Sequence, residues 1–286
     1  MTARILDGRA IAKVIVEEVR EQIADLERAG SPQPSIAVVR VGDDPASVRY
    51  ASQIQRACVG AGLGFQLVAL APNIVDADLA HALGQLNADP AVSGIILQFP
   101  LPRNLNSALA VEAIDPAKDI DGVNPLNVGR LVSATGRFFV PATPLGGLEL
   151  LRRAEIPLAG AYAVVVGRSE IVGKPLALLL LRRHATVTIC HSRTIDLARH
   201  TRQADILAVA AGRPALIVGD MVAPGATVLD FGMNVVEGAP VGDVDPATVG
   251  EVAGAITPVP GGTGPMTIAM LLVNALQAAK WQAPGR

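Results

Sequence analysis

Two patterns of apolar and polar residues alternate along the chain. In some segments an apolar residue recurs every three or four positions, as on an amphipathic helix, and the first of these runs from Gly8 to Gly30. Others are compact runs of Val, Ile, Leu and Ala, beginning with "SIAVVRV" at 35–41, which are typical of strands buried on both faces. Strands that alternate with helices predict parallel sheets joined by right-handed crossovers.

The first half of the chain continues this alternation. Ser47 is expected to cap a second helix that ends near Gly62. The other expected elements are strands at 65–70 and 92–98, helices at 76–88 and 104–114, and a polar loop at 115–125.

The second half of the chain predicts another sheet. It opens with helical spacing at 145–156 and continues with apolar runs at 161–167, 185–190, 206–212 and 226–232. A strand-like segment at 255–260 then leads into a long closing helix at 261–281. We therefore expect an α/β protein with two domains and a cleft between them, one formed by 1–143 plus the returning helix at 267–286, the other by 144–266.

Composition narrows the class of protein. Half of the 286 residues are hydrophobic but only 3% are aromatic, so aliphatic side chains must build the cores. The net charge is −2 and the chain has no long basic run, so nothing in the sequence indicates a surface that binds nucleic acid. No apolar run approaches the roughly 20 residues of a membrane span. Cys58 and Cys190 lack metal-ligand or redox spacing and are expected to be buried apolar residues. We expect a cytoplasmic protein without a bound metal.

The segment "VVVGRSEIVGKP" at 164–175 ends a predicted strand in a glycine turn. A nucleoside triphosphate loop needs four residues between its glycines and Ser or Thr after its lysine, whereas here five residues separate Gly167 from Gly173 and Pro175 follows the lysine. A dinucleotide turn fits better, because proline is tolerated in the first turn of the next helix. The acidic residue that would bind a ribose hydroxyl is missing, since the following strand ends in "CHSRT".

Basic residues replace that acidic residue. Arg168 lies in the turn, and Ser192 and Arg193 follow the next strand, where an adenosine 2′-phosphate would lie. Guanidinium groups bind phosphate through paired charge-assisted hydrogen bonds, and no carboxylate is present to repel it. The pattern favours NADP over NAD; the alternative is that both arginines are ordinary exposed charges.

Several segments, in order along residues 8–281, resemble the bifunctional methylenetetrahydrofolate dehydrogenase/methenyltetrahydrofolate cyclohydrolase family. They are "GIILQFPLP", "PAKDIDGVNPLNVGRL", "GRSEIVGKP", "TVTICHSRT" and "TPVPGGTGPMT". The resemblance implies a homodimer of two-domain α/β chains, with a tetrahydrofolate derivative in the cleft and NADP on a Rossmann-like second domain. Matching positions imply cofactor contacts at Thr143, Gly167, Arg168, Ser169, Ser192, Met233 and Gly264.

On the substrate side, the resemblance implies that Tyr50 packs against folate, that Gln98 partners a catalytic lysine, and that Asp121 binds the pterin. An aromatic ring and a carboxylate that accepts two parallel hydrogen bonds suit these roles. Taken alone, the same residues are read as helix packing, a strand-end cap and a solvated acidic loop. The turn formed by Pro260, Gly261 and Gly262 is also expected to bind substrate.

The catalytic lysine of the family lies four residues after the tyrosine, on the same helix face. Here that position is Ile54, and no lysine occurs from Val14 to Ala117. Hydride transfer mainly needs the two rings held together, whereas hydrolysis of the methenyl bridge needs a group that activates water and moves protons. The neighbours Arg49, Gln53 and Arg56 point about 100° or more away from this face, and arginine is a poor base.

We therefore predict an NADP-dependent methylenetetrahydrofolate dehydrogenase whose cyclohydrolase activity is lost or strongly reduced. One alternative is the ordinary bifunctional enzyme, with a shifted helix or a water molecule in place of the lysine. Two others are a folate-binding relative without catalysis and a dehydrogenase for an unrelated substrate. Accumulation of the methenyl intermediate would distinguish the first prediction from the bifunctional alternative.

Overall fold

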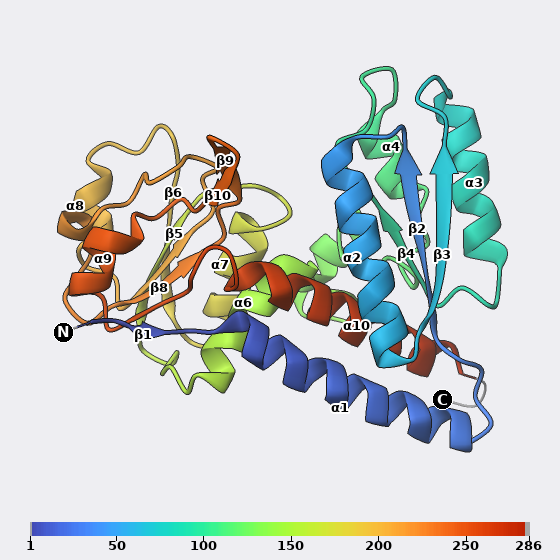
Figure 1. Cartoon of the computed structure of the whole chain (residues 1–286), viewed down its shortest axis with the longest axis horizontal. Coiled ribbons are helices and arrows are strands. Elements are labelled where there is room, and N and C mark those ends of the chain that lie inside the picture. The colour runs from blue at the N-terminus through green and yellow to red at the C-terminus, as the bar shows by residue number, and fades with distance from the viewer. Residues whose placement is uncertain (1, 284–286) are drawn as a thin grey trace. The chain divides into compact units, whose positions relative to one another are not determined.

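The computed structural model describes residues 2–283, and its contacts divide the chain into two compact units. Unit 1 comprises residues 2–12 and Thr143–Thr267, and unit 2 comprises Lys13–Ala142 and residues 268–283. Two long helices, α1 (Gly8–Arg28) and α10 (Thr263–Gln282), contribute residues to both units (Figure 1). The α/β class predicted from the sequence is confirmed.

Unit 2 contains a parallel sheet in the order β3-β2-β4. Its strands are β2 (Ser35–Val41), β3 (Gly64–Leu70) and β4 (Gly94–Leu97). Alternate residues of β2, Ala37 and Val39, pack with residues of α3 (Asp76–Ala88), and the intervening Ile36 and Val38 are also fully buried. Burial of both faces explains why this strand has a continuous apolar run.

Three helices of unit 2 follow a residue whose side chain accepts hydrogen bonds from the free backbone N–H groups of the first turn. Helix α2 (Pro45–Ala61) is capped by Asp44, which accepts hydrogen bonds from the Ala46 and Ser47 N–H groups. The predicted cap, Ser47, therefore lies inside the first turn, because Pro45 fits the first helical position and leaves the cap to Asp44. Asparagine caps begin the two short helices α4 (Ser107–Glu112) and α5 (Pro125–Ser133).

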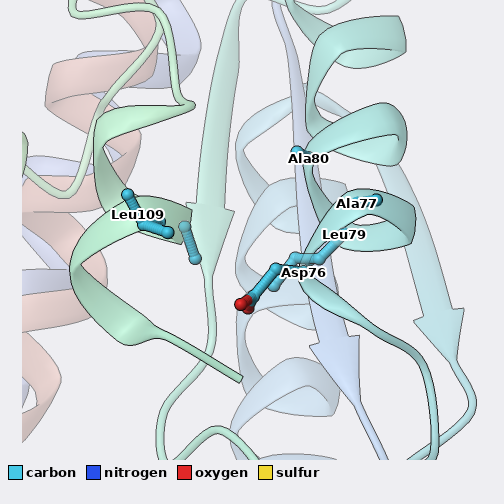
Figure 2. A pocket seen from close by; sticks show the side chains of 6 residues that line it. Asp76, Ala77, Leu79, Ala80 and Leu109 are labelled. Atoms are coloured by element: carbon cyan, nitrogen blue, oxygen red, sulfur yellow. The ribbon is translucent and has the colours of Figure 1, made fainter. Parts of the chain in front are cut away.

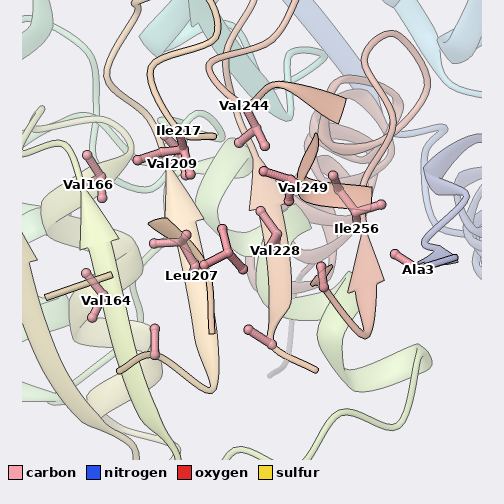
Figure 3. Packing of buried hydrophobic residues seen from close by; sticks show 14 of the residues in the cluster. Ala3, Val164, Val166, Leu207, Val209, Ile217, Val228, Val244, Val249 and Ile256 are labelled. Carbon is pink, nitrogen blue, oxygen red and sulfur yellow. The ribbon is translucent and has the colours of Figure 1, made fainter. Parts of the chain in front are cut away.

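Unit 1 contains a six-stranded parallel sheet in the order β1-β11-β8-β7-β5-β6, as in a Rossmann-like domain. After β6 the chain returns to the opposite side of β5 to form β7. Figure 3 shows Val164, Leu207, Val228 and Ile256 packed along one face of this sheet. The strands are β1 (Arg4–Ile5), β5 (Tyr162–Val166), β6 (Thr186–Cys190), β7 (Ile206–Val209), β8 (Thr227–Asp230) and β11 (Ala255–Ile256).

Residues 2–12 belong to unit 1, although the sequence places them in the N-terminal domain. The reason is that β1 pairs with β11 in parallel, with Arg4 opposite Ala255 and Ile5 opposite Ile256. A two-residue strand carries too little periodicity to be predicted.

Short elements complete unit 1. Strands β9 (Asn234–Val236) and β10 (Ala239–Val241) form a hairpin whose turn residues, Glu237 and Gly238, both have positive φ angles. Helix α6 (Ala142–Arg153) begins at the last residue of the first segment of unit 2 and otherwise belongs to unit 1. The other helices of unit 1, besides α1 and α10, are α7 (Gly173–Leu181), α8 (Leu197–Thr201), η1 (Gly219–Met221) and α9 (Pro246–Val252).

The two cysteines, Cys58 and Cys190, are buried, as the sequence predicts. Burial raises the pKa of each thiol. Among the helices of residues 2–283, none combines the length and apolar character that crossing a membrane requires.

Candidate functional site

A cavity of about 410 Å³ lies in unit 1 where three neighbouring strands end. The last residues of β5, β6 and β7 are in register, since Val166 pairs with both Cys190 and Val209. The segments that follow these strands therefore meet at the carboxyl edge of the sheet, where open α/β sheets bind ligands. The cavity is lined by Val166, Gly167, Arg168, Ser169, His191, Ser192, Thr194, Leu197, Ala210, Ala211, Arg213 and Leu216.

The glycine turn after β5 brings backbone segments into close contact. Gly167 has a φ of 133°, and a Cβ atom there would lie 2.2 Å from the Ala210 carbonyl oxygen. A Cβ atom on Gly173 would lie 2.2 Å from the Gly167 oxygen. The Ser169 hydroxyl accepts hydrogen bonds from the Val172 and Gly173 N–H groups and so closes the turn onto the start of α7. These glycines are therefore required for close approach of the backbone.

The charge of the cavity is positive. Arg168 and Arg213 line it, and none of the described residues that line it is acidic. The His191 ring lines it as well, with Nδ1 accepting a hydrogen bond from the Arg193 N–H group. A ligand with phosphate groups fits two guanidinium groups beside a glycine turn at a helix N-terminus.

The predicted cofactor residues divide between this cavity and its surroundings. Gly167, Arg168, Ser169 and Ser192 line the cavity together, whereas Arg193 is absent from the described residues that line it. The remaining predicted residues lie elsewhere in unit 1: Thr143, Met233 and Gly264.

Some of these outer residues are close to one another. The Met233 Cε atom lies 3.6 Å from the position that a Cβ atom would occupy on Gly264, and Met233 is 63% exposed. The Thr143 hydroxyl accepts a hydrogen bond from the Thr267 hydroxyl at 3.2 Å.

The predicted substrate turn at Pro260, Gly261 and Gly262 also lies in unit 1. It packs on the start of α1, where the Arg9 N–H group donates to the Gly261 oxygen at 3.1 Å. A Cβ atom on Gly8 would overlap the Gly262 oxygen, so this contact depends on glycine.

Arg213, which the sequence analysis missed, is held in place by Asp243. The Asp243 carboxylate accepts hydrogen bonds from the N–H groups of Ala211, Gly212 and Arg213 at 2.6–2.8 Å, and from the Asn234 side chain at 2.9 Å. The buried Asp230 carboxylate accepts in turn from the Asp243 N–H group. These bonds fix the loop after β7 that forms one wall of the cavity.

In unit 2 the structure brings Tyr50 and Asp121 close enough to interact electrostatically. Burial, followed by the proximity of Asp121, raises the pKa of the Tyr50 phenol above its usual value. Burial of the Asp121 carboxyl group, with Asp119 nearby, raises the pKa of Asp121 to about 7. Tyr50 therefore stays protonated near neutrality, while Asp121 changes charge there.

Asp119 positions the segment that carries Asp121. Its buried carboxylate accepts hydrogen bonds from the Val123 and Asn124 N–H groups and from the Asn127 side chain. Gly122 completes the bend with a φ of 69°. A Cβ atom there would lie 2.5 Å from the backbone of Val140, so this position requires glycine. Asp121 is thus presented by a fixed turn rather than by a solvated loop.

Position 54, where the family resemblance implies a lysine, lies on the buried face of α2. Ser47, Ala51 and Ile54 all belong to this face, and Ile54 is fully buried. Gln98 Nε2 donates to the Ser47 carbonyl oxygen at 3.1 Å, so Gln98 packs against the same helix. The buried Gln98 Oε1 atom has no hydrogen-bond partner among the described residues. An orphaned acceptor of this kind is uncommon in a folded protein.

Lys118, the next lysine along the chain after Lys13, makes its hydrogen bonds at the end of α3. Its ammonium group donates to the carbonyl oxygens of Leu86 at 3.1 Å and Asp89 at 2.6 Å, at the end of α3. Burial lowers the pKa of Lys118. It stabilises the end of this helix and does not replace a lysine on α2.

Another cavity lies in unit 2, between α3 and α4 (Figure 2). Its volume is about 340 Å³ and its walls are mainly apolar. Its carboxylate, Asp76, already accepts a hydrogen bond from the Asn106 N–H group at 2.8 Å. It contains none of the predicted site residues. It is lined by Asp76, Ala77, Leu79, Ala80, Leu109 and Ala110.

Comparisons with known proteins cover nearly the whole chain. Residues 6–121 match the catalytic domain of the tetrahydrofolate dehydrogenase/cyclohydrolase family, and residues 141–283 match its NAD(P)-binding domain. The chain is 54% identical to the "Bifunctional protein FolD" of Roseiflexus sp. (strain RS-1), over 100% of this chain and 99% of that protein.

Two solved structures show the same similarity in three dimensions. The bifunctional FolD enzyme of Campylobacter jejuni superimposes with a TM-score of 0.96 at 44% identity, over 98% of this chain and 100% of that chain. The FolD enzyme of Trypanosoma brucei, complexed with NADP and an inhibitor, gives a TM-score of 0.94 at 36% identity and 98% coverage of both chains. The resemblance seen in the sequence is confirmed, and the chain belongs to the tetrahydrofolate dehydrogenase/cyclohydrolase family.

Proposed function

We propose that this protein oxidises 5,10-methylenetetrahydrofolate to 5,10-methenyltetrahydrofolate with NADP, and that its cyclohydrolase activity is lost or strongly reduced. The first half of this proposal follows from family membership and from the positive cavity of unit 1. The second half depends on one observation, a fully buried isoleucine at position 54. The related FolD enzymes are named bifunctional, so the proposal separates this chain from them in one of two reactions.

The residues present suit the dehydrogenase reaction. NADP, when bound, supplies the acceptor for a hydride from the methylene carbon. Arg168 and Ser192 would bind its phosphate-bearing adenosine, and an ionised Asp121 would accept two hydrogen bonds from the aminopyrimidine edge of the pterin. Tyr50, which stays protonated, would pack its ring against the folate. Holding the two reactants in position is the main requirement of this step.

The residues around position 54 do not suit hydrolysis. Water activation needs a group whose pKa lies near the working pH. Gln98 does not titrate, Tyr50 stays protonated, and both oxygens of Asp121 are used when it binds the pterin. The unpaired Gln98 Oε1 atom supports this proposal, because an ammonium group at position 54 is the donor that it would be expected to accept from.

A coupled spectroscopic assay tests both halves. Purified protein receives methylenetetrahydrofolate and NADP, and the absorbances of NADPH and of the methenyl product are followed together. We expect both to rise in parallel and the methenyl absorbance to persist until the Campylobacter jejuni bifunctional enzyme is added. Rapid conversion to formyltetrahydrofolate without that addition would contradict the loss of cyclohydrolase, and the absence of NADPH would contradict the dehydrogenase.

We further propose that the protein works in the cytoplasm as a homodimer, as the family resemblance implies. Light scattering coupled to size-exclusion chromatography should give twice the mass of 29.5 kDa for the main species. A mass equal to one chain would contradict the dimer.

A further inference from the structure

We propose that Arg213 determines the preference for NADP over NAD, by binding the adenosine 2′-phosphate together with Arg168. The inference rests on the proposed use of a dinucleotide in the cavity of unit 1. It assigns the second guanidinium group of that cavity to the loop after β7, instead of to Arg193 after β6.

The first support is the place of Arg213 in the sheet. β5 lies between β6 and β7, so the segments after β6 and β7 approach the glycine turn from its two sides. Ser192 and Thr194 follow β6, the strand at whose end dinucleotide-binding sheets contact the adenosine ribose. Both residues line the same cavity as Arg213. Arg168, in the turn itself, lies between these two walls. A phosphate beside Ser192 would therefore be within a cavity that carries both guanidinium groups.

The second support is that both guanidinium groups are free to bind a ligand. Neither Arg168 nor Arg213 makes a side-chain hydrogen bond or an ion pair with any residue from 2 to 283. Other arginines of unit 1 are engaged, such as Arg202, whose guanidinium donates to the Asp220 carbonyl oxygen and pairs with its carboxylate. Two exposed, uncompensated positive charges in one cavity suit a dianionic phosphate.

The third support is the fixed backbone of Arg213. Its N–H group donates to Asp243 Oδ1 at 2.8 Å, and the two preceding N–H groups donate to Asp243 Oδ2. The Asp243 carboxylate accepts hydrogen bonds from these three donors and from the Asn234 side chain, and Asp243 is absent from the described residues that line the cavity. Arg213 therefore begins from a rigid position, which reduces the entropy lost when its side chain binds.

Binding measurements without folate test the proposal. Isothermal titration calorimetry would compare NADP with NAD, and 2′,5′-ADP with ADP, for the wild type and Arg213→Ala. We expect Arg213→Ala to lower the NADP-to-NAD affinity ratio about tenfold, equal to about 1.4 kcal/mol. The affinity for NAD and for ADP should change little. Arg199→Ala removes an exposed positive charge from α8, outside the lining of the cavity, and serves as the matched control.

Two results would overturn the assignment. An unchanged ratio in Arg213→Ala would exclude a contact with the 2′-phosphate, and an equal loss of affinity for NADP and NAD would place Arg213 on a part common to both. A similar fall in the ratio for Arg199→Ala would show an effect of net charge alone, which also contradicts a local contact. If the wild type bound neither dinucleotide, the proposed function itself would fail, and the calorimetry separates that outcome from the others.

Discussion

The cavity of unit 1 and the Tyr50–Asp121 region of unit 2 differ in which polar groups lack a partner. In unit 1, the side chains of Arg168 and Arg213 make no hydrogen bond or ion pair with residues 2–283, while Asp243 fixes the backbone of Arg213. In unit 2, position 54 is a buried isoleucine, and the Gln98 Oε1 atom has no hydrogen-bond partner among residues 2–283. In the proposed function, nucleotide binding and proton transfer depend on different units, so a substitution in one unit is expected to remove one reaction and leave the other.

The largest expected effect is from Ile54→Lys. We expect this variant to gain methenyl hydrolysis by about 10²- to 10⁴-fold, the usual contribution of one acid or base group. Gln98 Oε1 would supply an acceptor for the new ammonium group. The decay of the methenyl absorbance measures the gain, and thermal unfolding measures the cost of placing an amine at a buried position.

Two controls sharpen this prediction. Gln53→Lys places a lysine on the same helix at an exposed position, and Ile54→Leu keeps the position apolar. Neither variant should hydrolyse the methenyl product faster than the wild type. A gain in Gln53→Lys equal to that in Ile54→Lys would mean that any nearby amine suffices, and the comparison between the two regions would lose its basis.

The next effect is from Asp121→Asn. An amide presents one acceptor oxygen in place of two, and it also loses the charge that strengthens the hydrogen bonds to the pterin. We expect the KM for methylenetetrahydrofolate to rise by about 10- to 100-fold, with the affinity for NADP unchanged in calorimetry. A fall in NADP affinity of the same size would show that the two sites are not independent.

A smaller effect is expected from pH. Because the pKa of Asp121 is raised to about 7, its ionised fraction increases about tenfold between about pH 6 and pH 8. The KM for methylenetetrahydrofolate should fall by up to that factor as the pH rises, and this dependence should disappear in Asp121→Asn.

The same titration acts on stability in the opposite direction. The folded protein keeps the Asp121 proton at pH values where the unfolded chain has lost it, so the free energy of unfolding should decrease as the pH rises from about 4 to 7. Urea unfolding at several pH values measures this slope. A steeper fall in Asp121→Asn than in the wild type would contradict the assignment.

The smallest expected effect is from Asp243→Asn. The amide has too few acceptor positions for the four N–H donors of the wild type, so the loop after β7 should loosen. We expect the free energy of unfolding to fall by about 1–3 kcal/mol and the Kd for NADP to rise a few-fold. Asp220→Asn, which changes an exposed ion pair with Arg202, is the control and should be nearly neutral in both measurements.

The sequence predicted most of the regular structure because the central strands of both parallel sheets are buried on both faces. Strands such as β2 and β5 contain almost only aliphatic residues, and a continuous apolar run is recognisable without alternation. The cap of α2 was placed at Ser47 instead of Asp44, because both residue types cap helices and only the structure shows which carboxylate or hydroxyl accepts. The β9–β10 hairpin was missed, since each strand has three residues.

The sequence predicts those site residues that lie within one short motif. It does not predict a residue that reaches the site only through the order of the strands in the sheet. Gly167, Arg168 and Ser169 lie within one turn, so the sequence places them together. Arg213 lies far along the chain, and it reaches the same cavity because β7 returns to the other side of β5. Residue spacing does not show that β7 pairs with β5, so the segment "AAGRPAL", which contains Arg213, has the pattern of an ordinary loop.

The pairing of β1 with β11 has a consequence for folding during synthesis. Arg4 and Ile5 are made long before their partners in the sheet, Ala255 and Ile256. The ribosome must therefore release the chain as far as β11 before the six-stranded sheet can gain β1 as its edge strand. A fragment that starts at Thr143 would expose the edge of β11, and exposed strand edges favour aggregation. The nucleotide-binding unit should fold well only when the first dozen residues are supplied with it.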